Sequence, residues 1–307
     1  MRLRLALAAA SSALFVAAVD ACSASEPDAA SSVEGDAAPI DGAPGNPDDS
    51  GGGDDAAPAD ANGSDADQND ANGSDGGDAG PALTVKTNLI LWLAADQGVN
   101  ASGFTWSDLS GGGHDATQTN AAYRPTKQDM FFANGMPAVV VGAQQELVLP
   151  GSPLFDDFSN GVSIFLVYRP SLNIFSYPLH LGAPANRLAL AQTPSEGWAF
   201  VTSGKTSASN KAMTTNELHL FEVLAGGGNS AAVSLFRDGV AAGTDTTGVT
   251  NVTREPNFLG GGPPADAGTP PTYVSQGAYA EILVYKSLVT PMQQQAIESY
   301  LMARWGL

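Results

Sequence analysis

Residues 163–168 read Ser-Ile-Phe-Leu-Val-Tyr, and residues 281–285 read Glu-Ile-Leu-Val-Tyr. Both stretches are short, rich in β-branched and aromatic residues, and apolar at consecutive rather than alternate positions. A strand with two apolar faces is covered on both sides, so we expect these two segments to form the central strands of a layered β protein.

The surrounding sequence repeats this pattern, with glycines and prolines between the apolar segments. The pattern predicts an all-β, antiparallel β-sandwich. Asp238 and Gly239 supply the residue types of a type I′ hairpin turn after residue 236. The expected strands are 88–94, 137–141, 146–149, 163–168, 178–181, 187–192, 198–202, 219–224, 231–236 and 278–285.

One short α-helix is expected at the end of the chain. Thr290 is placed to cap it, Pro291 suits the first helical position, and Gln293 completes a capping box. Apolar residues then recur at near-helical spacing, which predicts that one stripe of the helix packs on the sandwich. These residues are Ile297, Tyr300, Leu301 and Trp305.

The first 22 residues are typical of an export signal. Arg2 and Arg4 precede an apolar run over 5–19 that is shorter than the roughly 20 residues of a membrane span. Cys22, the single cysteine of the chain, follows a segment like a bacterial lipobox. We expect a lipoprotein-type signal peptide over 1–22 and lipid on Cys22, which holds the protein to the cell envelope, at the outer membrane or cell surface. The alternative is ordinary signal cleavage after Ala21, which releases the protein.

Residues 23–81 form an acidic linker of Asp, Ala, Gly, Ser and Pro. It carries 15 acidic residues and no Lys, Arg or aromatic residue, so it cannot bury enough apolar surface to fold and is expected to be disordered. The formal charge of the chain is −19, but the part after residue 80 has 11 basic and 16 acidic residues, a net charge of only −5. Neither part offers the basic face that nucleic-acid binding requires.

The order of motifs from residue 83 onward resembles a known family. The motifs are residues 89–96, 106–118, 134–141, 163–168, 235–239, 280–285 and 297–307. They resemble the laminin-G-like, concanavalin-A-type jelly-roll domains of bacterial surface proteins. The resemblance implies a jelly-roll domain over 82–307. It says less about function, because this fold carries lectins, glycanases and adhesive modules.

No catalytic motif is recognised. Glycanases that resemble this fold place carboxylates at alternate positions of one strand, in a Glu-x-Asp-x-(x)-Glu pattern. Glu281 is instead followed at even spacing by Leu283 and Tyr285. Whether the protein is an enzyme stays open at this point, and a non-catalytic role is favoured.

The most suggestive segment for binding is 106–115. Trp106 offers an aromatic plate for a sugar, and Asp108, His114 and Asp115 offer polar groups around flexible glycines. Asp108 and Asp115 are also candidates for a Ca²⁺ site. The alternative is structural, with Trp106 in the core and Asp108 capping the turn.

Three further residues have two interpretations each. Arg124 suits either a ligand carboxylate or a surface acid. His180 and His219 lie in apolar segments and are interpreted as hydrogen-bonded packing residues rather than ligands.

These observations predict an exported, envelope-anchored binding module that recognises an extracellular or cell-wall carbohydrate. A non-catalytic protein-interaction or structural module is the alternative. A polysaccharide-degrading enzyme is a third hypothesis, since carboxylates from different strands can converge in space.

Overall fold

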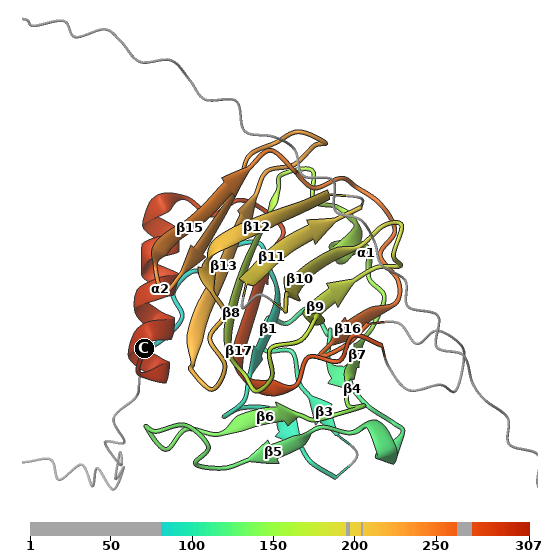
Figure 1. The fold of residues 1–307 in the computed structure, drawn as a ribbon, viewed down its shortest axis with the longest axis vertical. Coiled ribbons are helices and arrows are strands. Elements are labelled where there is room, and N and C mark those ends of the chain that lie inside the picture. The colour runs from blue at the N-terminus through green and yellow to red at the C-terminus, as the bar shows by residue number, and fades with distance from the viewer. Residues whose placement is uncertain (1–80, 103, 195–196, 204, 263–271) are drawn as a thin grey trace, which may run out of the picture. The chain divides into compact units, whose positions relative to one another are not determined.

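The computed structural model describes residues 81–102, 104–194, 197–203, 205–262 and 272–307. They form two antiparallel sheets packed as a sandwich, with a helix at the end of the chain (Figure 1). The predicted all-β fold is confirmed. The expected leader 1–22, the lipid on Cys22 and all but the last residue of the linker lie outside the described residues, so these stay predictions.

Sheet A has eight strands. Their order is β15-β14-β13-β8-β17-β6-β5, with β1 paired to β17. The strands are β1 (Leu89–Ala94), β5 (Thr126–Gln128), β6 (Ala138–Val141), β8 (Val162–Pro170), β13 (His219–Ala225), β14 (Val233–Arg237), β15 (Val240–Asp245) and β17 (Gly277–Tyr285).

Sheet B has nine strands in the order β12-β11-β10-β9-β16-β7-β4-β3-β2. They are β2 (Val99–Asn100), β3 (Thr105–Trp106), β4 (Ala116–Thr117), β7 (Leu147–Leu149), β9 (Ser176–Leu181), β10 (Leu188–Gln192), β11 (Gly197–Thr202), β12 (Lys205–Ala212) and β16 (Asn257–Leu259). A 3₁₀ turn (Ala121–Tyr123) and the one-turn helix α1 (Pro153–Asp156) complete the loops.

The two apolar segments that predicted the fold lie at the centre of sheet A. β17 pairs with β8 along one edge, and with β6 and β1 along the other. Every residue of β17 is buried, and within β8 only Arg169 is partly exposed. Both strands are therefore covered on both faces, as their sequences require.

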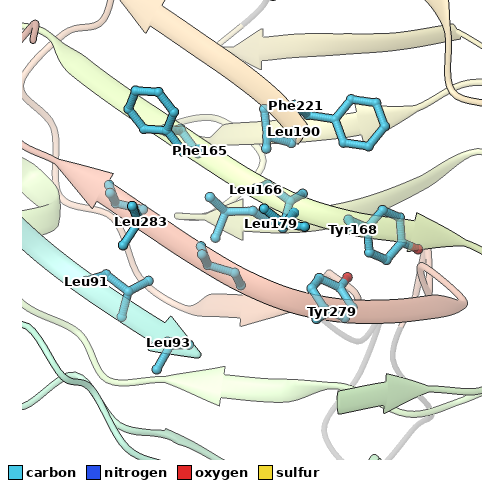
Figure 2. Close-up of a cluster of buried hydrophobic side chains, with 14 of the residues drawn as sticks. Leu91, Leu93, Phe165, Leu166, Tyr168, Leu179, Leu190, Phe221, Tyr279 and Leu283 are labelled. Carbon is cyan, nitrogen blue, oxygen red and sulfur yellow. The ribbon is translucent and has the colours of Figure 1, made fainter. Parts of the chain in front are cut away.

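The core lies between the sheets (Figure 2). Leu166 and Tyr168 of sheet A lie in one buried cluster with Leu179 and Leu190 of sheet B. Successive side chains of a strand point to opposite faces, so these residues define the inner face of each sheet. The outer faces carry the intervening residues.

Helix α2 (Pro291–Trp305) has the predicted caps. Thr290 Oγ1 accepts from Gln293 N, Gln293 Oε1 accepts from Thr290 N, and Gly306 ends the helix at φ 72°. The buried stripe is the predicted one, and it covers the outer face of sheet A. The hairpin turn is also confirmed, because Asp238 (φ 55°) and Gly239 (φ 72°) both have positive φ angles.

Seven strands were not predicted: β2, β3, β4, β5, β12, β15 and β16. Most of them are only two or three residues long, and β12 reads Lys-Thr-Ser-Ala-Ser-Asn-Lys-Ala. β12 lies at the edge of sheet B and is held by backbone pairing to β11. A polar edge strand carries no apolar pattern, because it needs only one partner and one covered face.

Within the described ranges, no helix is both long and apolar enough to cross a bilayer.

Candidate functional site

The side chains of segment 106–115, the candidate binding segment, make hydrogen bonds within the protein. Trp106 on β3 is fully buried, and its indole Nε1 donates to the Ala94 carbonyl at 2.9 Å. A ring enclosed in this way offers no exposed plate to a sugar. This geometry favours the structural alternative for Trp106.

Asp108 organises the same loop through its carboxylate. Its Oδ1 accepts from the backbone N–H groups of Trp92 and Ser110, and its Oδ2 accepts from His114 N and the Ser110 hydroxyl. Burial alone raises the pKa of Asp108, but the hydrogen bonds from His114, Trp92 and Ser110 outweigh it and the pKa is lowered. The carboxylate is therefore ionised, and donors from its own loop and from β1 bind it.

The neighbouring residues are also engaged within the protein. Asp115 Oδ1 accepts from Asp108 N at 2.8 Å, and His114 Nδ1 lies 2.8 Å from the Ile90 carbonyl. Arg124 donates to the carbonyls of Gln118 and Thr119 at 2.9 and 2.8 Å, so it pairs with backbone rather than with an acid.

The described contacts of Asp108 and Asp115 do not favour a Ca²⁺-binding role over a structural one. No group of three or more His, Cys, Asp or Glu side chains gathers as metal ligands in the described part of the chain. A ligand or calcium role for Trp106, Asp108, His114, Asp115 and Arg124 stays a prediction, and the geometry directs attention to a different face.

The outer face of sheet B carries a second buried cluster, separate from the core. It consists of Tyr177, Ala189, Ala191, Ala199 and Val201. Along β10 and β11, the four aliphatic members alternate with side chains of the main core such as Leu190 and Phe200. Tyr177 joins them where the register between β9 and β10 shifts. They therefore point away from sheet A, in a patch that α2 does not cover.

Tyr177 is the centre of this patch. Its ring centroid lies 5.3 Å from Phe175, 5.3 Å from Tyr273 and 5.1 Å from His180. Phe175 and Tyr273 meet each other edge to face at 5.5 Å. We call Phe175, Tyr177, His180, Arg187 and Tyr273 the aromatic face.

The outer part of the aromatic face is exposed to solvent. Phe175 is 42% exposed and Tyr273 is 53% exposed, and the aliphatic side chains of Leu172 and Ile174 are exposed beside Phe175 in sequence. Tyr273 has φ 53°, an outlier for a bulky residue, and its carbonyl accepts from Tyr177 N at 3.1 Å. Backbone strain of this kind is concentrated at sites that hold ligands.

Two polar groups of the aromatic face have unused hydrogen-bonding capacity. Arg187 Nη1 donates to the Tyr177 hydroxyl at 2.8 Å, and the guanidinium lies 5.6 Å from the Tyr177 ring centre. Arg187 Nε and His180 Nδ1 are buried and have no hydrogen-bond partner among the described residues. Most buried polar atoms are paired, so such atoms mark a place where a ligand or water completes the network.

The imidazole of His180 is neutral at neutral pH. Burial, and next the positive charge of Arg187, lower the pKa of His180 to about 4. His180 is buried as expected, but no described residue gives its Nδ1 the partner that a packing residue should have. His219 fits the expectation, because it meets Asp238 Oδ2 at 2.8 Å and the Thr214 hydroxyl at 2.7 Å.

A polar hollow of about 350 Å³ opens elsewhere on the molecule. Seven residues line it: Ser159, Gly227, Gly228, Asn229, Val249, Thr250 and Asn251. None of these described lining residues has an aromatic ring or a titratable side chain. The aromatic face has aromatic rings, titratable side chains and exposed surface together, so it is the stronger candidate for a ligand site.

Arg187 begins an expected strand and Tyr177 directly precedes another, but Tyr273 lies in no expected strand, and no role was predicted for any of the three. Their positions are far apart in the chain, and β16, which lies beside β9, was not predicted. The one available signal was a pair of aromatic residues, Phe175 and Tyr177, at the end of a loop.

Comparison with known proteins supports the fold. No protein-family model matches the chain, and no curated protein matches it. Among solved structures, a Trypanosoma rangeli sialidase in complex with the inhibitor DANA is 14% identical with a TM-score of 0.50. The match covers 71% of this chain and 33% of the sialidase, so the chain spans about a third of that protein.

Two further structures are similar. The binding domain of Paraclostridial Mosquitocidal Protein 1 is 10% identical with a TM-score of 0.50, over 70% of this chain and 52% of that one. Domain 4 of AbnA, a Geobacillus stearothermophilus arabinanase solved with arabinotriose, is 18% identical with a TM-score of 0.45. The match covers 67% of this chain and 96% of that domain. At these identities the likeness concerns the fold alone: the chain is similar in architecture to β-sandwich domains of this kind.

Proposed function

We propose that this protein is a carbohydrate-binding module that holds its ligand on the aromatic face of sheet B. The observation that carries the proposal is the pair of exposed rings, Phe175 and Tyr273, above a buried layer of polar groups with free hydrogen-bonding capacity. Sugars present C–H surfaces that pack on aromatic rings and hydroxyls that need such donors and acceptors.

The exposed apolar surface also suits a protein partner, since Leu172 and Ile174 add aliphatic area beside the rings. A sugar site and a protein site differ in one respect here. A sugar uses the polar groups beneath the rings, whereas a protein partner needs chiefly the apolar area.

A binding measurement with the full chain tests the proposal. A glycan array is followed by titration of the best hit against the wild type, Tyr273→Ala and Met292→Ala. Met292 is 81% exposed on α2 and serves as the control for losing an exposed apolar side chain. We expect Tyr273→Ala to weaken binding at least about 10-fold and Met292→Ala to leave it unchanged. Absence of any glycan hit, together with a saturable protein partner lost in Tyr273→Ala, would replace the sugar with a protein ligand.

We further propose that the protein is exported and anchored to the cell envelope through lipid on Cys22. The leader, the cysteine at its end and the acidic linker support this part of the proposal. In a bacterial host that processes lipoproteins, the wild type should partition with membranes and carry the mass of an acylated Cys22. Cys22→Ser should be found in the soluble fraction, and a wild-type protein that stays soluble with an intact leader would refute the anchor.

A further inference from the structure

Arg187 differs from Arg237, Arg254 and Arg304 in how its charge is balanced. Arg304 pairs with Asp96 at 2.6 Å, and Arg237 lies 3.4 Å from Asp238. Arg254 is buried, and its guanidinium donates to several backbone carbonyls. Among the described residues, Arg187 has one hydrogen-bond partner, the neutral hydroxyl of Tyr177, and no carboxylate lies within ion-pair distance of it.

Arg187 is nevertheless held in place. The hydrogen bond to Tyr177 and the contact with the Tyr177 ring fix the direction of the guanidinium. The same ring contacts the exposed rings of Phe175 and Tyr273. A guanidinium fixed in this way loses little further freedom when it binds a ligand. It still has N–H groups to donate, because Tyr177 takes only one.

Arg187 is the charged side chain of the aromatic face. The imidazole of His180 adds no charge to it, because burial and the charge of Arg187 keep that ring neutral. A ligand at the exposed rings therefore meets one fixed positive charge, and no carboxylate of the described residues lies beside that charge.

We infer that the aromatic face selects glycans that carry a carboxylate, with Arg187 binding that carboxylate. The inference rests on the proposed function, and it names the class of sugar that the site takes. A planar carboxylate accepts two parallel hydrogen bonds from a guanidinium, whereas the hydroxymethyl group of a neutral sugar accepts weaker, uncharged ones. The exposed rings hold the sugar, and Arg187 distinguishes the acidic sugar from the neutral one.

The test uses ligands that differ only in the carboxyl group. Uronic-acid oligosaccharides, namely oligogalacturonate and oligomannuronate, are titrated into the full chain beside their carboxyl-reduced counterparts. At least one acidic oligosaccharide should bind about 10-fold or more tightly than its reduced form, and added salt should narrow the difference. Equal affinity for the acidic and reduced forms would overturn the inference.

Variants assign the preference to Arg187. Arg187→Met should abolish the preference, so that the acidic and reduced forms bind with equal affinity. Arg169→Met is the matched control, because Arg169 is a partly exposed arginine of sheet A with no ion pair among the described residues. It should keep the full preference. Retention of the preference in Arg187→Met would refute the assignment, as would its loss in Arg169→Met.

Two further results keep the inference separate from the proposed function and from folding. Tyr273→Ala should weaken the acidic and reduced forms by the same factor. If some neutral glycan binds and Tyr273→Ala abolishes that binding, but no acidic glycan is preferred, the inference fails and the proposed function stands.

A second variant covers the case in which Arg187→Met does not fold. Tyr177→Phe removes only the hydroxyl that positions Arg187, and it should reduce the preference for the acidic form at least about 3-fold. A sulfated glycan preferred over every carboxylated one would overturn the carboxylate assignment.

Discussion

Two buried polar sites on the outer faces of the sheets, Glu281 on sheet A and the Arg187–His180 pair on sheet B, differ in how fully they are hydrogen-bonded. Under α2, Glu281 accepts from Trp92 Nε1 (2.6 Å), Tyr300 OH (2.7 Å) and Trp305 Nε1 (2.6 Å). On the aromatic face, Arg187 Nε and His180 Nδ1 have no partner within the described chain. A buried polar group that is fully paired stabilises a fold, whereas an unpaired one costs stability and needs another reason to be present.

The largest effect is expected from breaking the network on sheet A. Glu281→Ala leaves the donors of Trp92, Tyr300 and Trp305 buried without an acceptor and should cost about 3–5 kcal/mol of unfolding free energy. Urea denaturation measures this cost. The control is Gln295→Ala, at an exposed position of α2, which should change stability by less than about 0.5 kcal/mol. Similar stability for both variants would show that the network does not hold α2 on the sheet.

A second effect under α2 depends on pH. Burial and the neighbouring carboxylate of Glu298 raise the pKa of Glu222 to about 8. A carboxyl group with a raised pKa in the folded state favours folding below its unfolded pKa of about 4.5. That contribution is lost as the pH rises toward 8.

The difference in stability between the wild type and Glu222→Gln isolates the contribution of Glu222 from that of other titrating groups. Glu222→Gln stays neutral at every pH and keeps an acceptor for Gly239 N, which bonds to Glu222 in the wild type. The stability of the wild type relative to Glu222→Gln should fall by on the order of 2–4 kcal/mol between pH 5 and pH 9. Parallel stability curves from urea titrations across this range would contradict the shift.

The smallest effect on stability is expected on the aromatic face, where a substitution should stabilise the protein slightly rather than destabilise it. His180→Leu removes a buried atom without a partner and should leave the melting temperature unchanged or raise it by a few degrees, while it weakens ligand binding. His114→Leu is the matched comparison, since His114 Nδ1 bonds to the Ile90 carbonyl and its loss should cost about 1–3 kcal/mol. Equal destabilisation of both variants would mean that His180 is as well paired as His114.

Elements with a strong local pattern were predictable. The segments that became β8 and β17 are apolar on both faces, Thr290 and Gln293 cap α2, and Asp238-Gly239 makes the hairpin turn. Each of these depends on neighbouring residues only. The polar strand β12 and the three-residue strand β16 depend on partners distant in sequence, so their own residues do not reveal them.

The candidate site was not predictable for a related reason. Trp106 and Tyr273 are both aromatic residues next to glycine-rich or proline-rich loops; the sequence indicated Trp106 as a candidate plate, with burial in the core as the alternative, and gave no role to Tyr273. The structure encloses Trp106 and exposes Tyr273. Alternation along a strand assigns side chains to two faces, but it does not say which face another element will cover.

The sequence by itself determined an all-β sandwich with two central strands and a capped terminal helix, because those features follow from hydrophobic periodicity and from backbone preferences of single residues. It also determined the expectation of an exported chain with an acidic linker. Only the tertiary structure decided that Phe175, Tyr177, Arg187 and Tyr273 come together, and that Glu281 lies under α2. Those contacts join residues of different strands and loops, and their pairing is set by how the two sheets and the helix pack.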